Sequence, residues 1–182
     1  CQNIYNELNA YSGQGTLPNE INKTISCLGQ GEKNDVWYIF TVQSSGLLNF
    51  SITPNVLTDD YDWAVYNLSS ANCSDIFSNP SLEVACNFAG TPGVTGPNGL
   101  PGAQNEPPIP VLIGETYVIN VSQFTVSPNG YTISFGLSTA SILDITPPAI
   151  DSVNTNFVCG QDSFQVTFTE NIQCSSVQIS DF

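Results

Sequence analysis

Residues 36–68 read VWYIFTVQSSGLLNFSITPNVLTDDYDWAVYNL, and this stretch decides the fold class. Bulky apolar side chains recur at every second position in three runs, residues 36–42, 47–53 and 61–67. β-Branched and aromatic residues at a period of two are typical of β-strands. Ser-Ser-Gly and a Pro-Asn to Asp-Asp segment separate the runs. We therefore expect antiparallel strands at the centre of an all-β domain.

The composition indicates an extracellular β protein. The chain has 182 residues, of which 41% are hydrophobic and only 10% are charged. An ordinary soluble protein has about 25% charged residues, so Ser, Thr, Asn and Gln must supply most of the surface polarity here. No apolar run approaches the roughly 18 residues of a membrane span. A chain that starts at Cys1 resembles a mature form whose export signal has been removed.

The charge balance excludes several classes of function. The formal net charge is −14, Arg and His are absent, and Lys23 and Lys33 are the only basic residues. Binding of nucleic acid or anionic lipid requires several basic side chains, so we expect neither. Without His there is no imidazole metal site and no His-based catalysis. We expect a protein that is not an enzyme and whose small partners are cations.

The cysteines indicate an oxidising compartment. Proximity in the sequence predicts three disulfides, Cys1–Cys27, Cys73–Cys86 and Cys159–Cys174. A zinc site is a poor alternative because no C-x-x-C pair exists. A lipid-modified Cys1 is a further alternative, which would leave Cys27 unpaired.

Further strands are expected on both sides of a long loop. We expect strands over residues 21–28, 82–88, 109–113, 116–122 and 130–137, and a polar loop over residues 67–81. Together these give about seven or eight strands at the spacing of a β-sandwich. Residues 90–110 are too rich in Gly and Pro for regular structure. Such a loop is functional, ligand-stabilised or mobile, and the alternative is a floppy surface excursion.

The same loop contains a second group of oxygen ligands, Asn98, Asn105 and Glu106. These side chains predict a second metal site or a loop that contacts glycans. Ordinary loop polarity is the alternative.

A domain boundary is expected after residue 140. We expect a β-sandwich domain over residues 1–140, a Pro-rich linker over residues 141–149 and the first part of a second β domain over residues 150–182. Strands are predicted there over residues 164–169 and 177–182. The remaining chain is too short for a sandwich of about 100 residues, so we expect a longer parent protein.

Four sequence blocks together resemble a domain of the large secreted surface proteins of gliding Bacteroidetes. They are the Cys near the start, CL-x-x-GEKNDVWYIFTV, DDYDWAVYNLSSANC, and TGPNG…IPVLIGETYVINVS…GYTISF. The family includes gliding-motility adhesins exported by the type 9 secretion system. The first domain is also similar to the jelly-roll modules of the CUB and pre-peptidase C-terminal groups. The tail from ITPPAIDSV onward resembles the immunoglobulin-like repeats of such proteins.

The acidic turn is the candidate metal site. Asp59, Asp60 and Asp62 offer the carboxylate oxygens that Ca²⁺ prefers. Strand alternation directs Asp60 and Asp62 to one side. The resemblance to calcium-binding jelly rolls implies a second acidic loop, formed by Glu32, Asn34 and Asp35. The alternative is a solvated acidic turn.

Aromatic residues and one triplet suggest contacts with sugars. Trp37, Trp63, Tyr61 and Tyr131 are the rings available for glycan recognition, but their period of two favours a place in the core. The Asp-Ser-Val triplet at residues 151–153 resembles the O-glycosylation signal of Bacteroidetes, with Ser152 as acceptor.

The sequence thus predicts a non-catalytic segment of a cell-surface adhesin or filament, exported through secretion machinery of the outer membrane. Its expected partners are surface glycans or proteins, with no nucleic acid and no direct membrane insertion. Two alternatives stay open. One is an ancillary module of a secreted hydrolase, and the other is a structural protomer that self-assembles into an extracellular fibre.

Overall fold

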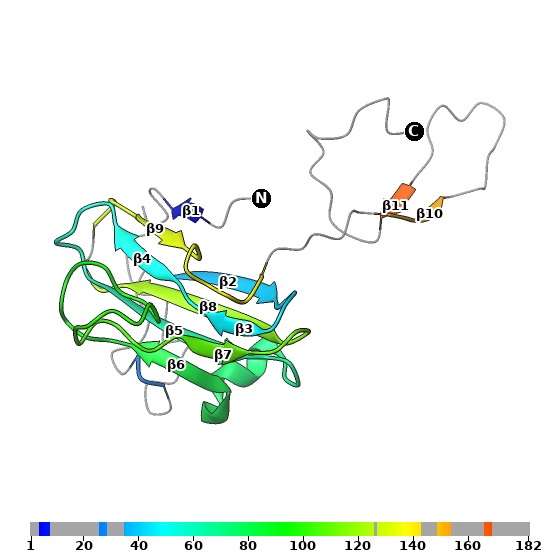
Figure 1. Cartoon of the computed structure of the whole chain (residues 1–182), viewed down its shortest axis with the longest axis horizontal. Coiled ribbons are helices and arrows are strands. Elements are labelled where there is room, and N and C mark those ends of the chain that lie inside the picture. The colour runs from blue at the N-terminus through cyan, green and yellow to red at the C-terminus, as the bar shows by residue number, and fades with distance from the viewer. Residues whose placement is uncertain are drawn as a thin grey trace. The chain divides into compact units, whose positions relative to one another are not determined.

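The computed structural model describes residues 26–28, 35–125, 127–142, 149–153 and 166–168, and the backbone of residues 4–7. The chain divides into two compact units, Cys1–Leu143 and Asp144–Phe182 (Figure 1). The division falls inside the Pro-rich segment that the sequence predicts to be a linker. Each unit is described by itself.

The first unit is built on a four-stranded antiparallel sheet in the order β2-β8-β5-β6. Its strands are β2 (Val36–Thr41), β5 (Tyr61–Asn67), β6 (Glu83–Asn87) and β8 (Thr116–Gln123). Each of them lies within one or two residues of a predicted strand. The period of two therefore located these four strands correctly.

The two faces of this sheet contribute to two different hydrophobic clusters. Tyr61, Trp63 and Val65 belong to the main core, whereas Ala64 and Tyr66 belong to a smaller cluster on the opposite face. All five are buried. The predicted alternation along β5 is confirmed.

A second layer of strands packs against the face that carries Trp63. It contains a three-stranded sheet in the order β1-β9-β4 and a two-stranded sheet β3-β7 (Figure 1). The strands are β1 (Ile4–Glu7), β3 (Gly46–Leu48), β4 (Ser51–Pro54), β7 (Ile109–Val111) and β9 (Tyr131–Ser134). The first unit is thus an all-β, antiparallel, two-layered structure.

The prediction of one continuous strand over residues 47–53 is wrong. β3 ends at Leu48 and pairs with β7, whereas β4 begins at Ser51 and pairs with β9. Residues 47–53 therefore contribute to two different sheets. Leu48, Phe50 and Ile52 are nevertheless fully buried on one side, because the hydrophobic period reports which side faces the core and not which strand is the partner.

Aromatic rings join the two layers in the main core. The ring centroid of Phe50 lies 5.3 Å from that of Trp63 and 5.6 Å from that of Phe135. Tyr61 and Tyr131 meet edge to face at 5.0 Å. Large rings in such arrangements bury much apolar area and add about 0.5–1.5 kcal/mol per pair.

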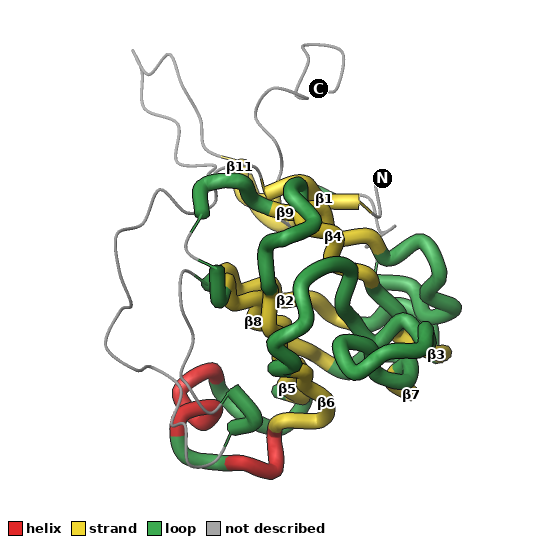
Figure 2. Tube along the Cα trace, turned by 90° about the vertical axis from the view of Figure 1, so that its left-hand side faces the viewer, coloured by secondary structure: helices red, strands yellow, loops and turns green. Residues whose placement is uncertain are grey.

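The outer face of the four-stranded sheet is covered in part by two short 3₁₀ helices, η1 (Cys73–Phe77) and η2 (Pro80–Leu82). Figure 2 shows them in red beside β5 and β6. They lie in and at the end of the polar loop predicted over residues 67–81, and they were not foreseen. Ile76 of η1 is buried in the smaller cluster. In the described part of the chain, no helix has the length and apolar character of a membrane span.

The second unit contains an antiparallel pair, β10 (Ile150–Val153) and β11 (Val166–Phe168). The predicted strand over residues 164–169 is confirmed in its central part. The prediction for residues 177–182 lies outside the described residues. All four residues of β10, including Ser152, are exposed.

Candidate functional site

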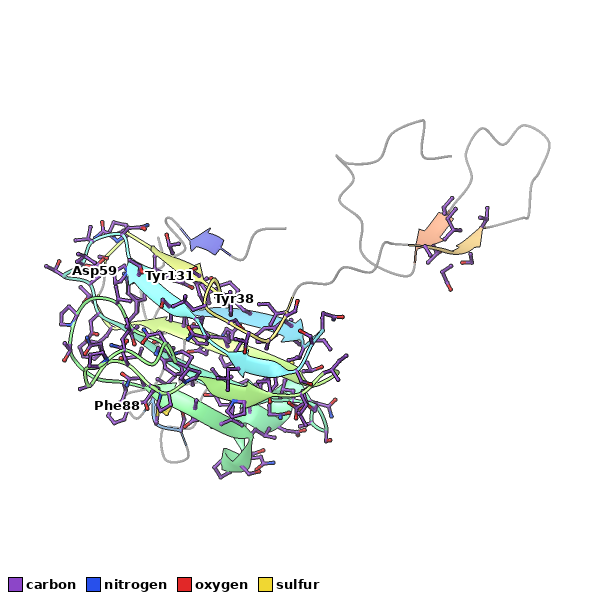
Figure 3. All side chains as sticks on the ribbon, in the orientation of Figure 1. Tyr38, Asp59, Phe88 and Tyr131 are labelled. Carbon is purple, nitrogen blue, oxygen red and sulfur yellow. A yellow bond between two sulfur atoms is a disulfide. The ribbon has the colours of Figure 1, made fainter. Side chains whose placement is uncertain are left out.

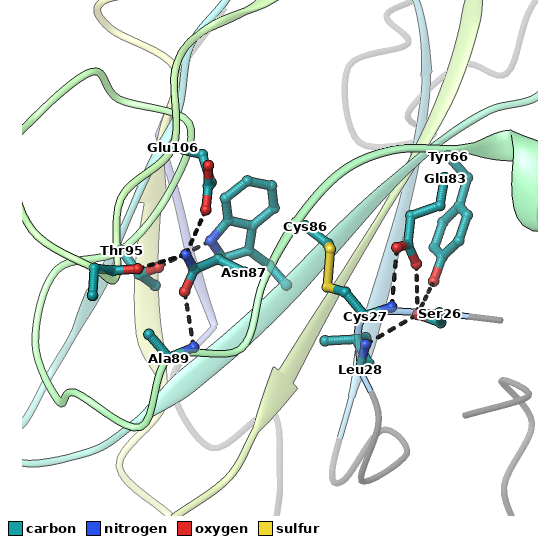
Figure 4. The surroundings of a disulfide bond; sticks show 12 residues. Ser26, Cys27, Leu28, Tyr66, Glu83, Cys86, Asn87, Ala89, Thr95 and Glu106 are labelled. Carbon is teal, nitrogen blue, oxygen red and sulfur yellow. Dashed lines mark hydrogen bonds between the residues drawn. A yellow bond between two sulfur atoms is a disulfide. The ribbon is translucent and has the colours of Figure 1, made fainter. Parts of the chain in front are cut away.

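A disulfide between Cys27 and Cys86 fastens residues 26–28 to β6 (Figure 4). The predicted pairs Cys1–Cys27 and Cys73–Cys86 are therefore wrong, and Cys73 is an exposed free thiol. Cys86 lies opposite Ala64 on the outer face of the sheet, and Leu28 packs into the cluster on that face. Packing across the sheet, rather than closeness in sequence, selects the partner. Cys1, Cys159 and Cys174 lie outside the described residues.

Glu83 adds hydrogen bonds to this covalent link. Its carboxylate accepts a hydrogen bond from the Ser26 hydroxyl at 2.5 Å and from the Cys27 backbone N–H at 3.0 Å. The Leu28 N–H in turn donates to Ser26 Oγ at 3.2 Å. In the described residues, Cys27, Glu83 and Cys86 are the only three Cys, Asp or Glu side chains whose ligand atoms lie within 4.8 Å of one another. Both sulfur atoms are engaged in the disulfide, so this group is a structural staple.

Asp59 lies at one end of the first unit (Figure 3) and is only 3% exposed. Its Oδ2 atom accepts hydrogen bonds from Ser127 Oγ at 2.5 Å and from Asn129 Nδ2 at 3.0 Å. Gln123 Nε2 donates to both Ser127 Oγ and the Tyr61 hydroxyl. Burial, followed by the charge of Asp59, raises the pKa of Tyr61 to about 12. Asp59 therefore fixes the loop between β8 and β9 to the start of β5.

Asp60 is in a different environment from Asp59. It is 6% exposed, and its carboxylate has no hydrogen-bond partner in the part of the chain that the structure describes. Its backbone is fixed, because its N–H donates to Thr125 Oγ1 and its carbonyl accepts from the Phe124 N–H. Burial raises the pKa of Asp60 above 3.8. Asp62 lies two residues further along β5, opposite Ser122.

Asp35 lies on the same outer face as Asp62. Its Oδ2 atom accepts a hydrogen bond from Asn120 Nδ2 at 2.7 Å, and Asn120 is opposite Ala64 of β5. Asn120 is fully buried, and its Oδ1 atom has no hydrogen-bond partner among the described residues. Alternation thus brings Asp35, Asp62 and Asn120 to one face and directs Asp59 to the other. The remaining predicted ligands, Glu32 and Asn34, lie outside the described residues.

The Gly- and Pro-rich loop is fastened to the core by buried hydrogen bonds. The Trp63 indole N–H donates to Thr95 Oγ1 at 2.9 Å, and the Thr95 hydroxyl donates to the Gln104 carbonyl at 2.5 Å. Gly96 has a φ of +141°, and a Cβ there would lie 2.2 Å from the Phe50 carbonyl oxygen. Only glycine allows the loop to approach the core so closely. The loop is part of the fold and not a floppy excursion.

The predicted oxygen ligands of this loop are engaged within it. Asn98 Nδ2 donates to Asn105 Oδ1 at 2.7 Å. Glu106 Oε1 accepts from Asn87 Nδ2 at 2.9 Å, and the same amide donates to the Ala103 carbonyl (Figure 4). These bonds give the three side chains a structural role that the sequence did not indicate.

The aromatic residues that the sequence singled out for sugar recognition are mostly core residues. Tyr61, Trp63 and Tyr131 are at most 2% exposed, and Trp37 stacks on Tyr66. Among the described residues, the exposed phenylalanine rings are those of Phe77, Phe88 and Phe124. Phe88, the most exposed of the three, lies at the end of β6 (Figure 3). The strand predicted over residues 82–88 includes Phe88 as its last residue, and this position at a strand end was the available signal.

An apolar groove of about 320 Å³ lies between the outer face of the sheet and η1. Its lining residues come from β2, β8 and η1, and they are Trp37, Tyr38, Ile39, Cys73, Ile76, Phe77 and Val118. Ile39 is 65% exposed beside it. None of these described lining residues is charged, so the groove suits an uncharged apolar group. Period-two analysis predicted strand β2 but gave no signal for this groove, because η1 was not foreseen.

Comparison with protein-family models, with curated proteins and with solved structures gave no match for this chain.

Proposed function

We propose that this chain is a non-catalytic segment of a large extracellular surface protein that serves in attachment or gliding motility. The observation that carries the proposal is the way its loops are fixed. The disulfide and Glu83 hold residues 26–28, Asp59 holds the loop between β8 and β9, and Thr95 holds the long loop. Loops on a rigid scaffold present a constant surface to a partner.

The proposed architecture is a jelly-roll β-sandwich followed by an immunoglobulin-like β unit. The two-layered antiparallel arrangement of the first unit supports the former, and the β10-β11 pair supports the latter. The disulfide supports an oxidising location outside the cytoplasm. We include export by the type 9 machinery and O-glycosylation at Ser152 in this proposal. The exposure of Ser152 on β10 is compatible with a glycan.

Surface glycans or proteins are the proposed partners, and binding to cells tests the function. Antibodies against the purified chain are expected to label intact cells that produce it. Purified chain coupled to beads is expected to be retained on immobilised polysaccharides or on intact cells more strongly than beads coated with albumin. Labelling that requires permeabilised cells, together with retention equal to albumin, would contradict the proposal.

We also propose a calcium site, with fewer protein ligands than the sequence predicted. Asp59 is left out, because Ser127 and Asn129 already occupy its Oδ2 atom. We propose Asp60 as the carboxylate ligand, with water completing the coordination, because among the described residues no group of three carboxylates that includes Asp60 lies within 4.8 Å. The buried carboxylate of Asp60, which has no hydrogen-bond partner among the described residues, supports a cation at this position. A bound cation would supply charge neutralisation and structural rigidity.

A thermal melting experiment tests the cation. Millimolar Ca²⁺ is expected to raise the Tm of the wild-type chain, because a ligand that binds only the folded state stabilises it. Asp60→Asn is expected to abolish this increase, whereas Asp151→Asn, at an exposed position of β10, is expected to preserve it. A wild-type Tm that does not change with Ca²⁺ would rule the site out.

A further inference from the structure

Two Asn-Gly pairs occur in the chain, Asn98-Gly99 and Asn129-Gly130. In such pairs the glycine nitrogen reaches the asparagine side-chain carbonyl carbon easily, because glycine has no Cβ to obstruct it. The resulting cyclic imide releases ammonia and then opens to aspartate or isoaspartate. Asparagine is for this reason a thermolabile residue. The surroundings of the two pairs decide which of them reacts.

Asn98 is protected at every atom that the reaction requires. It is 6% exposed. Its Nδ2 atom donates to Asn105, and its Oδ1 atom accepts from the Leu100 N–H at 2.9 Å. The attacking nitrogen, that of Gly99, donates to the Glu106 carbonyl at 3.1 Å. The side-chain amide and the nucleophile are therefore both held in hydrogen bonds.

Asn129 has much weaker protection. It is only partly buried. Its Nδ2 atom donates to Asp59 Oδ2 at 3.0 Å, but neither its Oδ1 atom nor the Gly130 N–H has a hydrogen-bond partner among the described residues. The backbone carbonyls of Asn129 and Gly130 accept hydrogen bonds from Asn55, but these bonds engage neither the Asn129 Oδ1 atom nor the attacking Gly130 nitrogen.

We propose that Asn129 is a site of spontaneous deamidation in the folded protein. The Gly130 nitrogen loses its proton to solvent and bonds to Asn129 Cγ, and the side-chain nitrogen takes up a proton and leaves as ammonia. Water then opens the imide, so the net reaction consumes one water molecule and requires no enzyme, metal or oxidant. The reaction converts a neutral amide into a carboxylate.

The new carboxylate would disrupt the hydrogen bonds of Asp59. A carboxylate only accepts hydrogen bonds, so the donor to Asp59 Oδ2 is lost and two negative groups face each other. Ser127, which bonds to the same oxygen, holds the loop between β8 and β9. Deamidation at Asn129 therefore loosens the loop between β8 and β9 slowly, as the modified fraction of the protein increases with time.

Peptide mapping by mass spectrometry tests the site, with Asn98 as the internal control. The full chain is kept in mildly alkaline buffer, either native or in concentrated urea, and digested at aromatic residues. In the native chain Asn129 is expected to convert several-fold faster than Asn98, and in urea the two rates are expected to converge. Equal native rates, or a faster Asn98, would overturn the proposal.

A pair of variants tests the structural consequence. Asn129→Asp is expected to lower the Tm by several degrees. Asn79→Asp changes the net charge equally, but its exposed side chain caps η2 through Oδ1, an acceptor that Asp retains. The control is expected to keep the wild-type Tm. Equal Tm values for the two variants would refute the claim that the Asn129 amide stabilises the loop.

Discussion

Removal of the Cys27–Cys86 disulfide tests how much this bond stabilises the first unit. Cys27 and Cys86 are 59 residues apart. In the chain-entropy account, a loop of this size restricts the unfolded chain enough to stabilise the fold by about 4 kcal/mol. The double variant Cys27→Ser/Cys86→Ser is therefore expected to lose about this much free energy of unfolding. Replacing both residues avoids a new free thiol that could exchange with Cys73.

Urea unfolding followed by tryptophan fluorescence measures the effect, because both tryptophans of the chain lie in the first unit. Cys73→Ser is the matched control, and its expected effect is close to zero since Cys73 is exposed and free. A pairing of Cys73 with Cys86 would instead stabilise by about 3 kcal/mol, and Cys73→Ser would then lose that amount. Such a loss, or a double variant that loses less than about 1 kcal/mol, would refute the pairing described above.

Three further substitutions test the loops. Thr95→Val is expected to cost about 1–3 kcal/mol, because it leaves the buried Trp63 N–H without an acceptor. Gly96→Ala is expected to cost at least about 2 kcal/mol, because its Cβ would meet the Phe50 carbonyl oxygen and its φ is positive. In the absence of Ca²⁺, the wild-type chain is expected to lose stability as the pH rises. Asp60→Asn is expected to remove this loss. The raised pKa of Asp60 means that the folded state holds a proton the unfolded chain releases, so stability falls as the pH rises from 3.8 through the folded-state pKa.

Each of these predictions has a control and a contradicting result. Thr95→Ser keeps the hydroxyl and is expected to retain most of the stability, so equal losses for Ser and Val would exclude the hydrogen bond as the cause. Gly90→Ala adds a Cβ where nothing lies within 4 Å and is expected to be nearly neutral, and a cost equal to that of Gly96→Ala would disprove the steric argument. Wild type and Asp60→Asn with the same stability profile at acidic pH would show that Asp60 does not titrate as described.

The strands could be predicted from the sequence where one face was consistently apolar. β2, β5, β6 and β8 followed directly from side chains that alternate between a core and a second environment. β1 could not be predicted, because Ile4–Glu7 is short and polar and is defined by its pairing with β9, more than 120 residues later. Pairing depends on contacts that no local pattern contains.

The candidate site was predictable only where local geometry governed it. Alternation correctly separated Tyr61 and Trp63 from the opposite face of β5. The partner of Asp59 was not predictable, since Ser127 lies 68 residues away in the sequence. The prediction of the disulfide pairing failed for the same reason, because proximity in the sequence does not show which segments pack on one face of the sheet.

The staple also has a mechanical consequence. A force applied to the two chain ends is transmitted across the sulfur–sulfur bond, so residues 28–85 lie in a closed ring that tension cannot straighten. At roughly 3.4 Å per residue, the 59-residue separation shortens the maximum extended length of the chain by about 200 Å. Strands β2 to β5 and the part of β6 before Cys86 lie inside this ring, so their backbone could not be pulled straight while the disulfide is intact.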